Sequence, residues 1–133
     1  MILSDIKGVH GLNSNASKTI LVIDDDETLR ELLGSMLKRM GYTVHVAENG
    51  KQAIQISESI EETIDIAILD LFLPDMRGDK VCPQIQTKHP GLKIIVMSGY
   101  GLQDTAVLNT TVHGFIQKPC TYEMLSKTIE SLN

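Results

Sequence analysis

Side chains that can bind a cation or a phosphoryl group stand directly after four short apolar segments. They are Asp24 and Asp25 after residues 19–23, Asp70 after residues 64–69, Ser98 after residues 93–97, and Lys118 after residues 114–117. Clustered carboxylates repel one another unless a cation neutralises them, and hard cations such as Mg²⁺ prefer oxygen ligands. A carboxylate can also attack phosphorus, while an ammonium and a hydroxyl group can bind the phosphoryl oxygens.

Each of these residues has an ordinary structural explanation when it is judged alone. Asp24 and Asp25 suit a solvated turn or a helix cap, and Asp70 suits a cap or a turn as well as a site. Ser98 suits a small loop residue, and Lys118 suits a surface charge. The combination of these types at four segment ends is harder to explain by caps, so the question is whether the four ends meet.

The spacing of the apolar residues predicts alternating strands and helices from residue 19 onward. The predicted strands are residues 19–23, 42–47, 64–69, 93–97 and 114–117. The predicted helices are residues 27–40, 49–60, 79–88, a short weak helix within 99–111, and 121–132. Asp26 is expected to cap the first helix and Gly41 to follow its end.

The third predicted helix carries further expectations. Pro83 is tolerable there only if it lies in the first turn, because an internal proline removes a hydrogen bond. Asp75 and Asp79 are expected to lie in the preceding loop and to cap this helix, and Asp75 is close enough to the acidic residues to tune the site.

Five strands that alternate with five helices imply an α/β fold, in which a parallel sheet has helices on both faces. In such sheets, ligands bind at the carboxyl ends of the strands. The four segment ends described above would therefore converge on one edge of the sheet.

Composition limits the class of protein. The 133 residues suit one domain at 18–133, preceded by a flexible arm or linker at 1–17. The net charge of −5 argues against direct contact with nucleic acid, and no apolar run is long enough to suggest a membrane contact. Two cysteines without a C-x-x-C pair favour a reduced, cytoplasmic setting.

Four segments, in this order, resemble response-regulator receiver domains of two-component systems. They are ILVIDDD at 20–26, DIAILDLFLP at 65–74 with Gly78 following, IVMSG at 95–99, and FIQKP at 115–119. The resemblance extends from residue 18 to about residue 132. It implies a flavodoxin-like (βα)₅ fold with a five-stranded parallel sheet in the order 2-1-3-4-5.

The resemblance also implies roles for individual residues. Asp70 is the phosphoacceptor, and the metal is Mg²⁺, for which Mn²⁺ can substitute. The implied metal ligands are Asp24, Asp25, Asp70 and the backbone carbonyl of Phe72, while Ser98 and Lys118 bind the phosphoryl group. Ser98 and Phe115 form a switch that changes the face of the fourth helix, fifth strand and fifth helix, and the Lys118–Pro119 bond is cis.

The implied partner is a histidine kinase or a histidine phosphotransfer protein, and the implied state is a monomer or weak dimer. Such a domain is not an enzyme, except that it catalyses its own phosphorylation and dephosphorylation. Stand-alone regulators and receivers within longer proteins both fit this pattern. The stretches at 98–100 and 115–119 resemble receivers of hybrid sensor histidine kinases.

Two other functions remain open alternatives. A pseudo-receiver would bind proteins without being phosphorylated, although the presence of Asp25, Asp70, Ser98 and Lys118 argues against it. A Mg²⁺-dependent phosphatase would need an acid two residues after its aspartate nucleophile, where this chain has Phe72. Phe72 and Tyr100 beside the site also suggest slow hydrolysis of an acyl phosphate.

Overall fold

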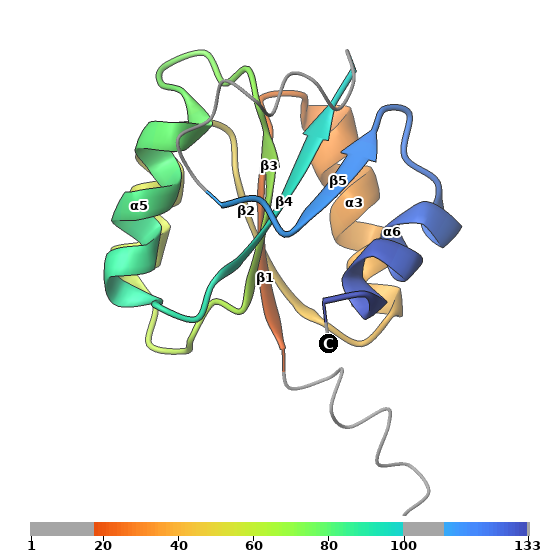
Figure 1. The fold of residues 1–133 in the computed structure, drawn as a ribbon, viewed down its shortest axis with the longest axis horizontal. Coiled ribbons are helices and arrows are strands. Elements are labelled where there is room, and N and C mark those ends of the chain that lie inside the picture. Colours follow the sequence, from red (N-terminus) through yellow and green to blue (C-terminus); the bar gives the residue numbers. More distant parts are fainter. Residues whose placement is uncertain (1–17, 100–110, 133) are drawn as a thin grey trace, which may run out of the picture.

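The computed structural model describes residues 18–99 and 111–132, and within them five strands and four helices (Figure 1). The strands are β1 (Thr19–Ile23), β2 (Thr43–Ala47), β3 (Ile66–Asp70), β4 (Lys93–Ser98) and β5 (Gly114–Gln117). The helices are α3 (Glu27–Arg39), α4 (Gly50–Ser59), α5 (Gly78–Lys88) and α6 (Tyr122–Glu130). The predicted arm at 1–17 and residues 100–110, where the weak fourth helix is predicted, lie outside the described residues.

All five strands are parallel, in the order β2-β1-β3-β4-β5, which confirms the predicted order. The register brings the carboxyl ends of neighbouring strands level. Ile23 of β1 lies opposite both Ala47 of β2 and Leu69 of β3. At the other side of the sheet, Ser98 of β4 lies opposite Gln117 of β5. The residues that follow these strands therefore share one edge.

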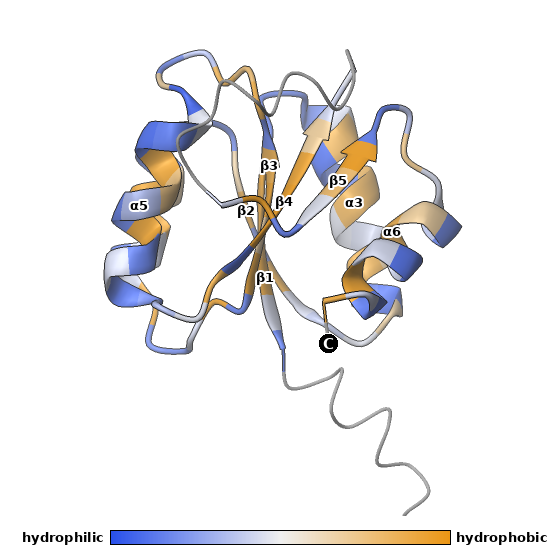
Figure 2. Cartoon of the chain, viewed as in Figure 1, coloured by the Kyte–Doolittle hydropathy of each residue, from blue (hydrophilic) through white to orange (hydrophobic). Residues whose placement is uncertain are grey.

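The helices cover both faces of the sheet and enclose two hydrophobic cores (Figures 1 and 2). Because successive side chains of a strand point to opposite faces, Leu21 and Ile23 face the core beneath α4 and α5. Ile20 and Val22 face the core beneath α3 and α6. β1 and β3 are buried along their whole length, as central strands of a parallel sheet should be.

The first helix begins and ends at the predicted signals. The Asp26 side chain accepts a hydrogen bond from the Leu29 backbone N–H at 3.2 Å, which confirms it as the N-cap of α3. Gly41 follows the end of α3 with a φ of 101°, a left-handed conformation that glycine adopts without strain. These caps fix where the chain leaves β1 and where it enters β2.

The prediction for Pro83 is wrong. α5 begins at Gly78, one residue earlier than predicted, and Pro83 lies in its second turn rather than its first. The helix continues because Val81, Cys82 and Ile85 on its inner face are all buried, with exposed fractions of 1% or less. Burial of these side chains outweighs one missing backbone hydrogen bond.

The prediction that Asp75 caps the helix following it is also wrong. Its carboxylate instead accepts hydrogen bonds from the backbone N–H groups of Gly50 at 2.8 Å and Lys51 at 2.9 Å, at the start of α4. Asp79 does not cap α5 either: the N-cap of α5 is Arg77, and Asp79 lies in the first turn, where it pairs with Arg77 at 3.1 Å.

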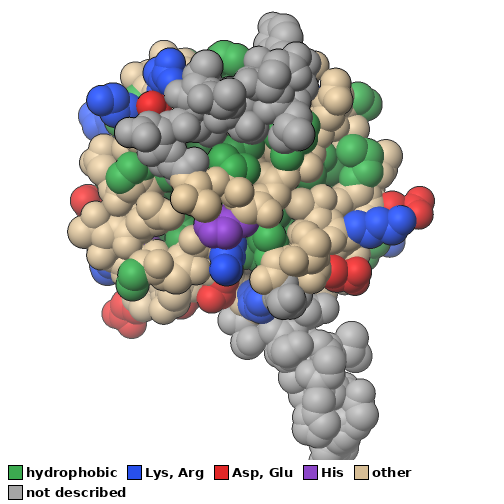
Figure 3. All heavy atoms as spheres, viewed as in Figure 1, with side chains coloured by type: hydrophobic (Ala, Val, Ile, Leu, Met, Phe, Trp, Pro, Cys, Tyr) green, Lys and Arg blue, Asp and Glu red, His purple; other side chains and the backbone are tan. Residues whose placement is uncertain are grey.

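No helix within residues 18–99 and 111–132 has the length and apolar character needed to cross a bilayer. On the face drawn in Figure 3, side chains of both charge signs are interspersed. Hydrophobic side chains reach the surface between them.

Candidate functional site

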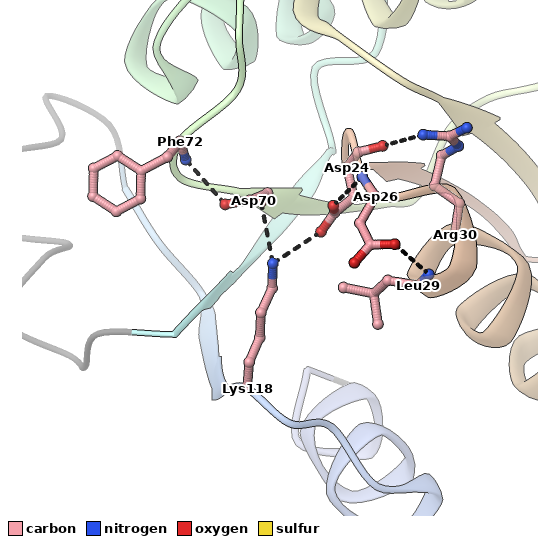
Figure 4. A network of polar contacts seen from close by, with 7 residues as sticks. All are labelled: Asp24, Asp26, Leu29, Arg30, Asp70, Phe72 and Lys118. Atoms are coloured by element: carbon pink, nitrogen blue, oxygen red, sulfur yellow. Dashed lines mark hydrogen bonds and ion pairs between the residues drawn. The ribbon is translucent and has the colours of Figure 1, made fainter.

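The candidate site lies at the carboxyl edge of the sheet, where the structure brings together side chains from distant parts of the chain (Figure 4). Asp24 follows β1, Asp70 is the last residue of β3, and Lys118 follows β5. They point toward one another because parallel strands in register end at the same edge. Ser98 ends β4 at this edge.

Three carboxylates form an acidic cluster. Asp24, Asp25 and Asp70 each offer one oxygen, and these oxygens all lie within 4.8 Å of one another. Asp24 and Asp70 are buried, with exposed fractions of 2% and 8%, while Asp25 is exposed. The cluster thus has a buried side and a side that opens to solvent.

Lys118 bridges the two buried carboxylates. Its Nζ lies 3.1 Å from Asp70 Oδ2 and 3.3 Å from Asp24 Oδ2, and 28% of its side chain is exposed. With three carboxylates and one ammonium ionised, the formal charge of the cluster is −3 + 1 = −2. Lys118 therefore neutralises only part of the negative charge.

Burial and neighbouring charges shift two pKa values in the site. Burial raises the pKa of Asp24 above its ordinary value, and the charge of Asp70 raises it further. The hydrogen bond from the Asp26 N–H and the charge of Lys118 oppose this rise without reversing it. Burial alone would lower the pKa of Lys118, but the charges of Asp70 and Asp24 outweigh burial and raise it.

The second oxygen of Asp70 is held by its own loop. Asp70 Oδ1 accepts a hydrogen bond from the Phe72 backbone N–H at 3.0 Å. Phe72 is 56% exposed, and its ring points away from the acidic cluster. Asp70 is thus oriented through both oxygens, by Phe72 on one side and by Lys118 on the other.

Ser98 and Phe115 lie on neighbouring strands and on the same face of the sheet. Phe115 is opposite Val96, which is two residues before Ser98, and side chains two residues apart share a face. Ser98 is fully buried, and the half-buried Phe115 packs against the core beneath α4 and α5. Their roles as a switch stay predictions.

The chain between β5 and α6 holds Lys118 in place. The Lys118 backbone N–H donates to the Ser98 carbonyl at 2.8 Å, which extends the pairing of β4 with β5 by one residue. The next peptide bond, Lys118–Pro119, is cis, as the resemblance implies.

Sequence reasoning did not identify Arg30, which supports the loop that carries Asp24 and Asp25. Its Nη1 donates to the backbone carbonyl of Asp24 at 2.8 Å, and its Nη2 lies 4.0 Å from a Glu48 carboxylate oxygen. The Arg30 side chain is 15% exposed. An arginine near the start of an amphipathic helix is usually solvated, so the sequence carries no signal for this contact.

Comparison with known proteins gives a consistent result. Residues 20–130 match the family described as the response regulator receiver domain. The chain is 36% identical over 111 residues to a cyclic di-GMP phosphodiesterase of Thermotoga maritima, covering 80% of this chain and 28% of that protein. It is 31% identical over 121 residues to the sensor kinase CckA of Brucella abortus, covering 89% of this chain and 13% of that protein. The chain thus spans less than a third of either relative.

Solved structures share the fold. A Burkholderia pseudomallei response regulator with a phosphorylated aspartic acid, a calcium ion and citrate superposes with a TM-score of 0.73 at 28% identity, covering 84% of this chain and 65% of that one. The Thermotoga maritima response regulator TrrA in complex with Mg²⁺ and BeF gives 0.70 at 29% identity, covering 87% and 99%. On its sequence match and its fold, this chain belongs to the response regulator receiver domain family of two-component signalling.

Proposed function

We propose that Asp70 is the phosphoacceptor of this receiver domain and takes its phosphoryl group from a phosphohistidine of a partner protein. The observation that carries this proposal is the position of Asp70. Its carboxylate ends a buried central strand, lies within 4.8 Å of two further carboxylates, and is 3.1 Å from the Lys118 ammonium. The family match and the phosphorylated aspartic acid of the Burkholderia regulator support this choice of chemistry.

The donor set fits Mg²⁺. Three carboxylates offer hard oxygen ligands, and their formal charge of −3 exceeds the single charge of Lys118 by two. We assign Asp24, Asp25, Asp70 and the Phe72 carbonyl to this metal, and the Mg²⁺ complex of TrrA supports the assignment. When bound, Mg²⁺ would neutralise the carboxylates and the oxygens of the incoming phosphoryl group.

The residues of this chain supply the remaining chemistry. A carboxylate oxygen of Asp70 attacks phosphorus and forms a P–O bond as the P–N bond to the donor imidazole breaks. The electron pair of that bond stays on the imidazole nitrogen, which takes a proton from water. Lys118 remains charged at neutral pH because its pKa is raised despite burial, by the negative charges of Asp70 and Asp24. It can therefore bind a phosphoryl oxygen.

We assign the response to phosphorylation to Ser98 and Phe115. The Ser98 hydroxyl lies at the same edge as Asp70 and would donate to a phosphoryl oxygen, while Phe115 follows into the space that Ser98 leaves. Such a change is a shift between two packings, biased by the new charge-assisted hydrogen bonds. It would alter the face formed by β5, α6 and the segment between β4 and β5.

Receiver domains work with histidine kinases or histidine phosphotransfer proteins, and we propose one of these as the phosphodonor. The similarity to the sensor kinase CckA is consistent with a phosphorelay role. The remainder of the cyclic di-GMP phosphodiesterase is not matched by this chain, so its name does not transfer.

Intact mass spectrometry tests the proposal directly. The protein is incubated with acetyl phosphate and Mg²⁺, beside the Asp70→Asn variant and beside a sample with excess chelator. We expect one added phosphoryl group in the first sample and none in the other two. A wild-type protein that gains no mass, while another receiver is labelled in the same buffer, would favour a pseudo-receiver that binds proteins without phosphorylation.

A further inference from the structure

The loop that follows Asp70, residues 71–77, is fastened to α4 by a carboxylate. Asp75 Oδ1 accepts from the Gly50 N–H at 2.8 Å, and Asp75 Oδ2 accepts from the Lys51 N–H at 2.9 Å. The first N–H groups of a helix have no acceptor within the helix. These two hydrogen bonds hold the pKa of Asp75 below its ordinary value.

Asp75 does not duplicate the cap that α4 already has. The N-cap Asn49 accepts from the Gln52 N–H at 2.8 Å and so serves a different backbone donor. Asn49 precedes α4 directly in the chain, whereas Asp75 is 25 residues away from Gly50. Loss of Asn49 would weaken α4 alone, but loss of Asp75 would also release the loop.

Apolar packing holds the same loop from the other side. A Cβ atom on Gly50 would lie 2.6 Å from Met76 Sδ and 2.9 Å from Val81 Cγ2, so these side chains fill the space over the bare Gly50 backbone. Met76 also packs against the core beneath α4 and α5. Polar and apolar contacts therefore attach the Asp75–Met76 corner to the same point on α4.

The loop is also anchored at its beginning, and Phe72 lies between the two anchors. Leu71 is buried with an exposed fraction of 3%. The next residue, Phe72, is 56% exposed and donates its backbone N–H to Asp70 Oδ1 at 3.0 Å. The orientation of the Phe72 backbone therefore depends on the residues that hold each end of the loop.

We propose that Asp75 is a positioning residue for Asp70: by tying the loop to α4, it holds the Phe72 amide against Asp70 Oδ1. Its consequence for phosphoryl transfer rests on the proposed function of Asp70. The geometric part of the proposal is that Asp75 positions the Phe72 amide. It does not rest on that function, because it concerns a backbone hydrogen bond that exists with or without a phosphodonor.

Amide hydrogen exchange followed by NMR tests the geometric part, with Asp75→Ala and a matched control, Asn49→Ala. We expect Asp75→Ala to raise the exchange rates of Gly50 and Phe72 by about tenfold, the scale of one hydrogen bond to a charged group. Asn49→Ala should raise exchange at Gln52 and leave Phe72 unchanged. Asp75→Asn, which keeps one acceptor oxygen, should give an intermediate rate and replaces Asp75→Ala if that variant does not fold.

Two results would overturn the proposal. One is an unchanged exchange rate of the Phe72 amide in the Asp75 variants. The other is an equal rise of that exchange rate in Asn49→Ala, which would mean that the Phe72 amide responds to the stability of α4 alone.

Phosphorylation by acetyl phosphate tests the functional part separately. At equal folded fractions, we expect Asp75→Ala to be phosphorylated about fivefold more slowly than wild type, and Asn49→Ala to match wild type. Equal rates in all three proteins would refute the functional part. If the wild-type protein takes no phosphoryl group, the proposed function fails, and the exchange rates still decide whether Asp75 positions Phe72.

Discussion

Replacing Lys118 by methionine should make the stability of the domain depend on Mg²⁺. The variant keeps the length of the side chain and removes the charge that lies 3.1 Å from Asp70 Oδ2 and 3.3 Å from Asp24 Oδ2. Asp24, Asp25 and Asp70 then repel one another without a counter-charge. A cation that binds these carboxylates would relieve the repulsion, and would do so more strongly in the variant than in wild type.

The size of the effect follows from the geometry. At an effective dielectric constant of about 20, each pair at this separation attracts by about 5 kcal/mol before solvation is counted. The cost of removing the charges from water cancels much of this gain, and the Lys118 side chain is 28% exposed, so solvent screens it in part. We expect a net loss of about 1–3 kcal/mol without Mg²⁺.

Thermal unfolding at pH 7.5 measures this loss, with and without Mg²⁺. The loss corresponds to a fall in Tm of about 3–12 °C, and Mg²⁺ should reduce the deficit because it stabilises only the folded state. Lys127→Met, on the exposed side of α6, controls for the change in net charge. An equal deficit with and without Mg²⁺, or a variant more stable than wild type without Mg²⁺, would refute the reasoning.

Three further predictions concern single side chains. The backbone hydrogen bonds from Gly50 and Lys51 lower the pKa of Asp75 in the folded protein. The stability that Asp75 contributes is therefore complete above its ordinary pKa of 3.8 and is lost as the pH falls through its pKa in the folded protein. Urea unfolding should therefore show a lower free energy of unfolding for Asp75→Asn than for wild type at pH 7, and a smaller difference between the two at about pH 3. Because the Phe72 ring points away from the acidic cluster, Phe72→Ala should leave the rate at which Asp70 loses phosphate unchanged, as intact mass over time can check. A wild-type half-life of seconds would contradict slow hydrolysis. Burial raises the pKa of Cys82 to about 12, so iodoacetamide at pH 8 should modify Cys120 first in the native protein, as peptide mapping can check.

The sequence was sufficient for the part of the site that depends on strand ends. The apolar runs of β1, β3 and β4 are buried, and Asp70 and Ser98 are the last residues of their strands. Parallel strands in register end at one edge, so the sequence predicts that the residues at the ends of β1, β3 and β5 lie close together. The strand order itself came from the family resemblance, since alternation alone allows several orders.

The sequence was insufficient for contacts between loops that are distant in the chain. The sequence predicts that Asp75 caps the helix that follows it, because local capping is the usual role of an aspartate in that position. Its actual donors lie 25 residues earlier, and only the packing of α4 against α5 brings them within reach. The Arg30 contact has a different cause: its acceptor is only six residues away, but it is a backbone carbonyl, which no sequence pattern marks. Pro83 shows the related case in which tertiary burial overrides a local rule.

The contacts of Asp70 explain why the surrounding residues matter as much as the carboxylate itself. One oxygen accepts from a backbone amide and the other from an ammonium, so the carboxylate cannot turn without losing a hydrogen bond. Both hydrogen bonds stabilise the charged form and so make it a weaker nucleophile, but they keep it in a single orientation. Lys118 is shared with Asp24, whose own pKa is raised by burial, so a change at any one of these three groups alters the charge felt by the other two. The reactivity of Asp70 is therefore a property of the cluster and of the loops that hold it.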